Sequence, residues 1–387
     1  MTRLPLPEAP PAAVRVDGVR LARYLDALDA DIARGRLPGA VVLVARRGRV
    51  VLHEARGRLR PDADVPMPRD AVFRIYSMTK PVVSVAALRL FEQGRLHVAE
   101  PLARWLPAFA SPVVGRERRP AARGATVLDL LRHTAGFSHE FAGCAGESLY
   151  AGAELGSRER DNAQLADALA ALPLVHEPGS VWDYSRATDV LGRVIEVVCD
   201  APLGEVLRRE VFEPLGMHDS GFALPPDRHA RLAEPHARDA DSGAPIEMWD
   251  PRVPAPLQSG GSGLLSTAAD YARFLAALSR GGELDGARLL GRKTIEWMTA
   301  DHLGALPRAG TALPPGWGFG LGVAVRTHAG FAPDPGSVGS WGWSGASGTI
   351  FVVDPAEELF AIFMAQAPTQ CERCWGLFRQ MVYAAID

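Results

Sequence analysis

Ser77 and Lys80 stand three positions apart in the stretch FRIYSMTKPVVSVAALRLFEQGRL, residues 73–96. Apolar residues recur at helical spacing after Ser77, and Gly94 is placed to end the helix that they predict. Positions three apart share one face of a helix, so the hydroxyl and the amine would be neighbours. A serine hydroxyl becomes a good nucleophile only when a base takes its proton, and a neutral lysine amine can do this. The pair therefore predicts a nucleophile and its base.

The base role explains why a lysine stands at this position. Of the 42 lysine and arginine residues only two are lysines, Lys80 and Lys293. An arginine does not release its proton in proteins. A lysine has a reference pKa of ~10.4, so the site would have to lower it by about three units, at a cost of about 4 kcal/mol. The alternative is a chance match to the motif, with Lys80 a solvated residue at the start of a helix.

Two further segments carry groups that could complete such a site. Tyr184 follows the Pro-Gly loop of EPGSVWDYSRATDVLG, residues 177–192. Its phenol could relay a proton between Ser77 and a leaving group, or be a half-buried aromatic with a solvated hydroxyl. The glycine-rich segment SWGWSGASGTIFVVDP, residues 340–355, runs into a predicted strand. Its free N–H groups suit half of an oxyanion hole, with the N–H of Ser77 as the other half. Taken alone, this segment fits a glycine-rich turn with tryptophans packed on the surface better than an oxyanion hole.

The elements expected to position these groups are strands at both ends of the chain and helices in the middle. Helices are predicted at 17–34, 163–172, 187–199, 203–211, 267–280 and 375–386, a hairpin at 39–57, and β-rich segments at 317–325, 347–355 and 358–366. Residues 111–125 are predicted to form a loop. Residues 138–162 are predicted to form an irregular insertion that could shape the mouth of a cleft.

This order predicts an α+β fold, an α/β sandwich in which one antiparallel sheet is built from both chain termini, flanked by helices and interrupted by a mostly helical domain. We assign residues 1–85 and 315–387 to the sheet domain and residues 86–314 to the helical domain. A small-molecule site is expected in the cleft between them.

The composition narrows the possible partners and location. A net charge of −3 with scattered basic residues favours neither nucleic acid nor an anionic membrane. No run is apolar enough to cross a bilayer, and the N-terminal residues hold prolines and charges in place of a signal peptide, so a cytoplasmic location is expected. The four cysteines are expected to be reduced thiols. Cys371 and Cys374 form a single C-x-x-C, which is weak evidence for zinc, so no metal or cofactor is predicted.

Six blocks in a consistent order give the chain a specific resemblance. It resembles the serine β-lactamase and penicillin-binding-protein superfamily over nearly its whole length, and within it the class C-like branch that includes the carboxylesterases of family VIII. The blocks are YSMTKPVVSVAALRLFEQGRLHVAEPLARWLP, TVLDLLRHTAGF, PGSVWDYS, VFEPLGMHDSGF, SGGSGLLSTAADYARF and PGWGFGLG.

The resemblance implies a role for each matching residue. Ser77 matches the nucleophile, Lys80 its base and Tyr184 the motif tyrosine, while His133 matches a histidine interpreted as structural. The segment from Trp343 through Ser344 to Gly345 falls where lactamases and peptidases carry Lys-Thr-Gly. The N–H of Ala346 would then join that of Ser77 in the oxyanion hole. Ser344 itself is not expected to be a nucleophile, because its surroundings only partly match G-x-S-x-G and a strand follows.

Two departures from the lactamase pattern affect the expected substrate. Arg186 stands where the tyrosine motif usually ends in asparagine, which puts binding of a substrate amide carbonyl in doubt. Trp343 replaces the cation that holds the substrate carboxylate, as it does in the esterase branch. Trp343, Ser344, Gly345 and Arg186 are therefore predicted to contact an uncharged, short acyl substrate.

These observations predict a serine hydrolase that cleaves a small-molecule carboxylic ester through an acyl-enzyme on Ser77. The alternatives are a β-lactamase or D-alanyl-D-alanine peptidase, and acyl transfer to an alcohol or amine. A non-catalytic binding protein of the same fold is a further alternative, which the intact Ser77, Lys80 and Tyr184 disfavour. The natural substrate and the oligomeric state are not predicted.

Overall fold

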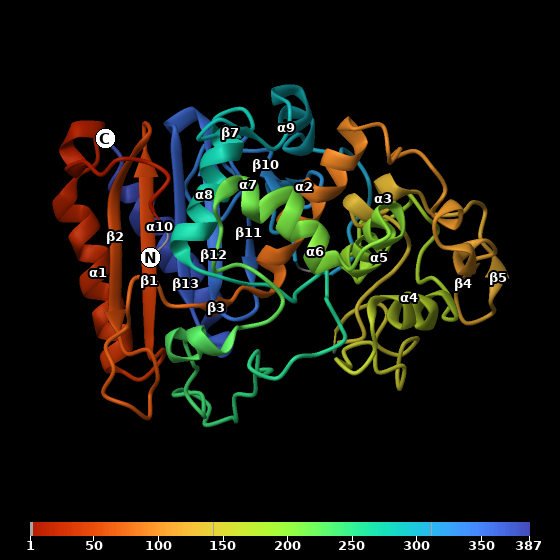
Figure 1. The fold of residues 1–387 in the computed structure, drawn as a ribbon, viewed down its shortest axis with the longest axis horizontal. Coiled ribbons are helices and arrows are strands. Elements are labelled where there is room, and N and C mark those ends of the chain that lie inside the picture. Colours follow the sequence, from red (N-terminus) through yellow and green to blue (C-terminus); the bar gives the residue numbers. More distant parts are fainter. Residues whose placement is uncertain (1–2, 142, 311) are drawn as a thin grey trace.

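The computed structural model describes residues 3–141, 143–310 and 312–387, and its main feature is a seven-stranded antiparallel sheet (Figure 1). The strand order is β2-β1-β13-β12-β11-β10-β9. The strands are β1 (Gly39–Arg46), β2 (Arg49–Gly57), β9 (Trp317–Phe319), β10 (Ala324–Arg326), β11 (Trp341–Gly345), β12 (Thr349–Asp354) and β13 (Leu359–Ala365). Because β1 pairs directly with β13, the two ends of the chain close one sheet, which confirms the predicted fold class.

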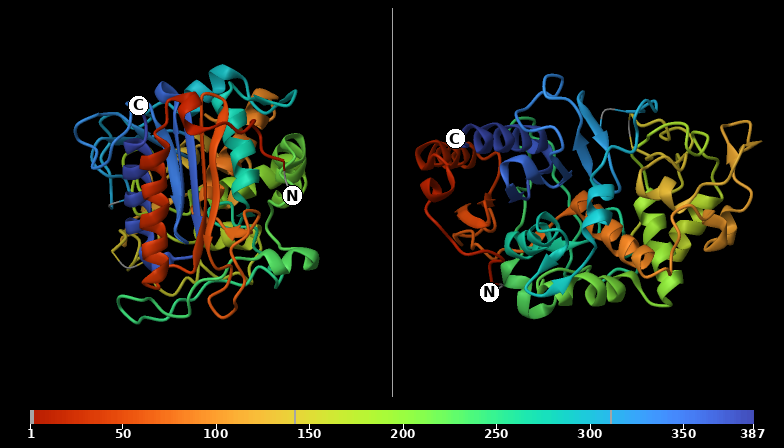
Figure 2. Two further views of the ribbon diagram at one scale, coloured as in Figure 1. Left: turned by 90° about the vertical axis from the view of Figure 1, so that its left-hand side faces the viewer. Right: turned by 90° about the horizontal axis from the view of Figure 1, so that it is seen from above.

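Helices cover both faces of this sheet because its central strands are apolar on both sides. Every residue of β1 is buried, with Val42 and Val44 in one apolar cluster and Val41 and Leu43 in the other. α1 (Gly18–Ala33) and α10 (Cys371–Ala384) pack together over the first face, where α1 lies in front of the sheet in the left view of Figure 2. α8 (Ala268–Ser279) packs against β1 and β13 on the second face.

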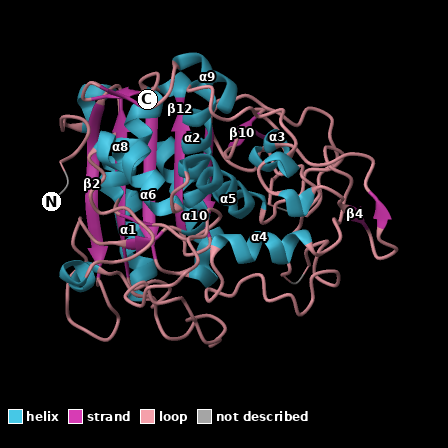
Figure 3. Cartoon of the chain, turned by 45° about the vertical axis from the view of Figure 1, so that its right-hand side comes forward, coloured by secondary structure: helices cyan, strands magenta, loops and turns pink. Residues whose placement is uncertain are grey.

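The remaining helices gather beside the second face (Figure 3). They are α2 (Thr79–Glu92), α3 (Val127–Leu131), α4 (Asn162–Ala170), α5 (Ala187–Cys199), α6 (Leu203–Leu207) with the π-helix η5 (Arg208–Phe212), α7 (Glu213–Leu215) and α9 (Arg292–Met298). α2 is buried along nearly its whole length and packs against α5 and α6. The start of α2 is therefore held in place by the packing of the helix against its neighbours.

Short elements complete the chain. The 3₁₀ helices are η1 (Pro11–Val14), η2 (Tyr76–Met78), η3 (Leu102–Arg104), η4 (Pro107–Phe109), η6 (Pro226–Arg231), η7 (Pro355–Glu357) and η8 (Pro368–Gln370). Three two-stranded ribbons pair β3 (Phe73–Arg74) with β6 (Leu265–Ser266), β4 (Val113–Val114) with β5 (Arg119–Pro120), and β7 (Glu283–Leu284) with β8 (Ala287–Arg288). None of the helices in the described ranges is long and apolar enough to cross a membrane.

The structure differs from the predicted elements at several places. The tryptophan-rich segment before β12 is a full strand, β11, rather than part of a turn, and its tryptophans are buried. The loop predicted at 111–125 contains the β4–β5 ribbon, and the last helix starts at Cys371. Residues 138–161 form turns as expected, although Ala142 lies outside the described residues. The predicted domain boundaries stay a prediction; Met1, Thr2 and Thr311, which they include, also lie outside the described residues.

A buried carboxylate, Asp129, fixes the loop that leads to Tyr184. It accepts hydrogen bonds from Arg123 Nη1 at 2.6 Å, from Thr126 N at 2.9 Å and from Thr134 Oγ1 at 2.9 Å. The carbonyl of Thr134 in turn accepts from the N–H of Gly179 at 2.7 Å. Burial acts to raise the pKa of Asp129, but the hydrogen bonds from Arg123 and Thr126 outweigh it and lower the pKa to about 2.

We expect Asp129→Asn to destabilise the protein in a pH-dependent way. A carboxyl with a folded-state pKa of about 2 and an unfolded value of 3.8 adds stability above pH 3.8 that is lost as the pH falls toward 2. Urea unfolding should show a loss of about 2 kcal/mol at about pH 6.5 that shrinks at about pH 3. The exposed Asp26→Asn serves as control. A difference between wild type and Asp129→Asn that stays constant with pH would contradict this assignment.

Candidate active site

The structure brings five of the predicted site residues to one cavity of about 790 Å³. Ser77 lies in η2 at the start of α2, and Lys80 lies in the first turn of α2. Tyr184 and Arg186 come from the loop before α5, and Ala346 comes from the turn after β11. Trp343, Ser344 and Gly345 belong to β11 and are not among the residues that line this cavity, so their predicted contact with substrate stays a prediction.

The backbone that leads to Ser77 is clamped by the β11–β12 turn and the end of β13. The carbonyl of Arg74 accepts hydrogen bonds from Ser347 Oγ at 2.7 Å and from Gln366 Nε2 at 3.2 Å. The carbonyl of Ile75 accepts one from Thr349 Oγ1 at 3.3 Å. These bonds tie strands from the C-terminal part of the chain to the residues just before the nucleophile.

A sharp turn then presents Ser77 to the cavity. Tyr76 has a φ of 44°, a left-handed conformation that is uncommon for an aromatic residue. On the other side of Ser77, the carbonyl of Met78 accepts a hydrogen bond from the buried Tyr271 hydroxyl at 2.9 Å. In the part of the chain that the structure describes, neither the N–H of Ser77 nor that of Ala346 donates a hydrogen bond within the protein. Two residues that line this cavity thus have backbone N–H groups without an acceptor among the described residues.

The Lys80 amine lies beside Ser77 in a buried place. Its Nζ is 3.4 Å from Ser77 Oγ, donates to the carbonyl of Gly261 at 2.9 Å and sits 4.4 Å from the centroid of the Tyr184 ring. The residue is 2% exposed, and no carboxylate of the described residues lies within ion-pair distance of Nζ. The other lysine, Lys293, has a 79% exposed side chain and pairs with Glu296. The two lysines of the chain therefore occupy opposite environments.

Tyr184 is held by the aromatic residues around it. Trp343 Nε1 donates a hydrogen bond to the Tyr184 hydroxyl at 3.2 Å, and the two rings are 5.2 Å apart. Within the described residues no hydrogen bond joins that hydroxyl to Ser77 or Lys80. The buried Trp343 thus acts on the cavity through Tyr184.

His133 packs under Tyr184, with ring centroids 5.0 Å apart. Burial holds the pKa of His133 well below its usual value of 6.5. Its Nδ1 accepts a hydrogen bond from the N–H of Ser185 at 3.3 Å. These contacts suit the structural role expected of His133, which stays a prediction.

A charge network that the sequence reasoning missed connects Arg186 to Lys80. Arg186 forms ion pairs with Glu140 and, at 3.6 Å, with Asp189. Asp189 also accepts a hydrogen bond from the N–H of Gly261 at 3.0 Å, and the carbonyl of Gly261 accepts from Lys80. Asp189 lies in the first turn of the predicted helix 187–199, three positions after Arg186. That spacing could have indicated the ion pair between the two residues.

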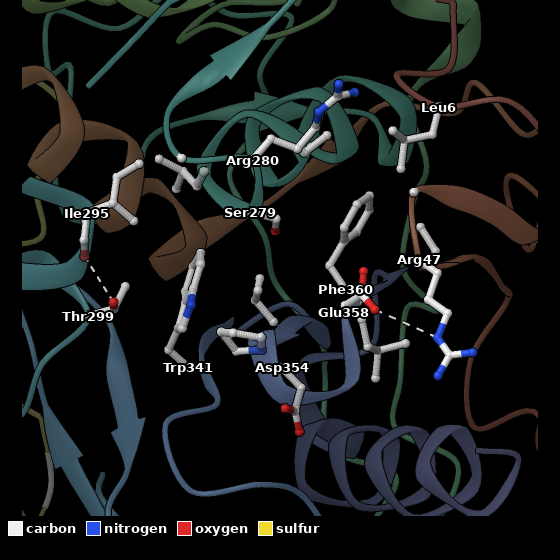
Figure 4. Close-up of a pocket in the computed structure, with 18 of the residues that line it drawn as sticks. Leu6, Arg47, Ser279, Arg280, Ile295, Thr299, Trp341, Asp354, Glu358 and Phe360 are labelled. Carbon is white, nitrogen blue, oxygen red and sulfur yellow. Dashed lines mark hydrogen bonds and ion pairs between the residues drawn. The ribbon is translucent and has the colours of Figure 1, made fainter. Parts of the chain in front are cut away.

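A second cavity, of about 540 Å³, lies between α8, α9 and the sheet (Figure 4). Its floor is apolar and includes Trp341, Val353 and Phe360. Its hydroxyl groups belong to Ser279 and Thr299, and the Thr299 hydroxyl donates to the carbonyl of Ile295 at 2.9 Å. No lysine or histidine is among its described lining residues, whereas the cavity that holds Ser77 is also lined by Lys80.

No group of three or more metal-ligating side chains is found in the described ranges. Cys371 and Cys374 are free thiols at the start of α10, and burial raises the pKa of each to about 12.

Comparison with known proteins identifies relatives along most of the chain. A family model described as Beta-lactamase matches residues 21–373. Esterase EstB of Burkholderia gladioli is 34% identical, covering 92% of each chain, and lovastatin esterase of Penicillium rubens is 30% identical, covering 78% of this chain and 79% of its own. Among solved structures, EstCE1, a hydrolase with promiscuous acyltransferase activity, superposes with a TM-score of 0.81 at 30% identity, covering 94% of this chain and 99% of its own.

We expect Gly345→Ala to lower the stability of the fold and to displace β11 beside the cavity. A Cβ at this position would lie 2.2 Å from the carbonyl oxygen of Ile75 and 2.4 Å from Thr349 Oγ1, so β11 would have to move from the turn that carries Ser77. Chemical denaturation should show a loss of about 1–3 kcal/mol. Gly376→Ala in α10 is the matched control, because its Cβ would meet no atom within 4 Å. Equal stability of the two variants would contradict the close packing.

Proposed function

Because this chain belongs to the beta-lactamase family, we propose that it is a serine hydrolase that cleaves carboxylic esters through an acyl-enzyme on Ser77. One observation carries the proposal: the buried Lys80 amine faces the Ser77 hydroxyl at 3.4 Å with no carboxylate partner among the described residues. A lysine amine at this distance can take the hydroxyl proton when it acts as a base, which an arginine cannot do.

In the first step of the proposed reaction, Ser77 Oγ attacks the carbonyl carbon of the ester. The Oγ–C bond forms, the hydroxyl proton passes to Nζ of Lys80, and the electron pair of the carbonyl moves onto its oxygen. The free N–H groups of Ser77 and Ala346 would stabilise that oxyanion, each with a typical effect of ~10²–10³ on rate. Their lack of acceptors within the described protein supports this role.

In the second step the bond between the carbonyl carbon and the alcohol oxygen breaks, and the alcohol leaves with a proton. Tyr184 relays that proton from Lys80 in this proposal, which is supported by its place in the cavity and by the contact of its ring with Nζ. Because the Tyr184 oxygen accepts its hydrogen bond from Trp343, the hydroxyl proton stays free to be donated to the leaving group. Water then attacks the acyl-enzyme, releases the acid and restores Ser77.

The contacts of Arg186 and Trp343 favour an ester over a lactam as the substrate. Both residues stand where lactamases carry groups that hold a lactam substrate. Glu140 and Asp189 already bind the Arg186 guanidinium, and Trp343 is buried against Tyr184. The esterase relatives support the same choice. The promiscuous acyltransferase activity of EstCE1 supports a second candidate activity, transfer of the acyl group from Ser77 to an alcohol instead of water.

We expect Ser77→Ala to abolish hydrolysis of p-nitrophenyl esters, with a loss of at least about 10³-fold in kcat, because no acyl-enzyme can form. The far-ultraviolet circular dichroism spectrum should stay unchanged. Ser279→Ala, which removes a hydroxyl from the second cavity, should keep wild-type turnover. Wild-type protein should turn over a chromogenic cephalosporin more slowly than the p-nitrophenyl ester. Substantial ester turnover by Ser77→Ala would end the proposal.

We expect Lys80→Arg to be almost as damaging, lowering kcat by about 10²–10⁴-fold, because a guanidinium keeps the charge but cannot accept a proton. Steady-state kinetics with the same ester measures this effect. Lys293→Arg makes the same chemical change at the exposed lysine and should leave kcat intact. Only a mild loss in Lys80→Arg would argue against lysine as the base.

A further inference from the structure

A third basic side chain, Arg158, lines the cavity that holds Ser77, beside Lys80 and Arg186. It belongs to the irregular segment 138–161, whose role the sequence left open. Its guanidinium carbon lies 4.0 Å from the ring centroid of Trp249, which also lines the cavity. Stacking uses the flat face of a guanidinium and leaves its N–H edges free to bind a planar anion.

The Trp249 platform is itself fixed in place. Its carbonyl accepts a hydrogen bond from Arg74 Nε at 2.6 Å, and its ring packs against a small apolar cluster that includes Val72 and Leu265. Arg74 belongs to the clamped backbone that leads to Ser77. Trp249 and Arg74 therefore connect the stacked Arg158 to the backbone that leads to Ser77.

Arg158 has no anionic partner in the described part of the protein, where no carboxylate lies within ion-pair distance and no acceptor takes its N–H groups. It is half-buried, and burial lowers the pKa of its guanidinium, an effect that the nearby Tyr76 hydroxyl offsets in part. An arginine stays charged nonetheless. Arg186, in the same cavity, is neutralised by two carboxylates. Arg158 is thus a partly desolvated charge that lacks a counter-ion.

We propose that Arg158 binds a carboxylate of the substrate, so that the preferred ester carries a negative charge on the part that reaches Trp249. The planar carboxylate would accept two N–H bonds from the edge of the stacked guanidinium. The inference rests on ester hydrolysis at Ser77 and adds the substrate class. It changes the expectation of an uncharged substrate, which came from Trp343, a residue buried behind Tyr184.

The test compares two esters that differ in charge and share a leaving group: the mono-p-nitrophenyl ester of glutaric acid and p-nitrophenyl pentanoate. Arg158→Gln should lower kcat/KM for the glutarate monoester by about 10- to 100-fold, the size of a lost charged hydrogen-bond pair. The pentanoate should change by less than about threefold. Arg280→Gln removes the same charge from the second cavity and should leave the ratio of the two esters as in wild type. An Arg158→Gln variant in which kcat/KM falls equally for both esters, or falls for neither, would overturn the assignment.

A binding measurement separates this inference from the proposed chemistry. Monomethyl glutarate should bind to Ser77→Ala in ligand-observed NMR, and the additional change Arg158→Gln should remove that binding. Binding without any ester turnover by wild type would keep the anion site and reject the esterase. Turnover of pentanoate by wild type with no Arg158-dependent binding of monomethyl glutarate would keep the esterase and reject the anion site.

Discussion

The contact between the Lys80 amine and the Ser77 hydroxyl is the interaction on which the rest of the site depends. It places an amine, without a carboxylate partner among the described residues, 3.4 Å from a hydroxyl. Nearly all the other basic residues of the chain are arginines. Such an arrangement costs stability, since burial of an unpaired amine is unfavourable. A chemical role is the simplest explanation for a buried amine that costs stability and lines a cavity.

The architecture around this contact serves to hold it still. The sheet is closed by strands from both ends of the chain, and its β11–β12 turn grips the backbone before Ser77. From the other side, the buried α2 packs against α5 and α6, and the tyrosine of α8 holds the carbonyl of Met78. Pre-organisation of this kind is what a nucleophile and its base require, because small displacements cost large factors in rate.

Much of this arrangement could be predicted from the sequence, since local patterns determine it. Periodic apolar residues gave the positions of α1, α2 and α5, and the S-x-x-K spacing identified Ser77 and Lys80. The strand β11 was harder to predict, because its glycines and tryptophans fit a turn as well as a strand, and only pairing with β10 and β12 decides between them. Contacts between distant segments, such as Arg158 on Trp249, leave no local signal at all.

The central claim is an acyl group carried by Ser77, and trapping that intermediate tests it most directly. Wild-type protein should be mixed with p-nitrophenyl acetate, quenched with acid within milliseconds to seconds, and digested for peptide mass spectrometry. The account predicts one acetyl group, on the peptide that contains Ser77, and none on the same peptide of Ser77→Ala. Steady release of p-nitrophenol with the acetyl group on another residue, or with no acylated peptide at any time, would contradict it.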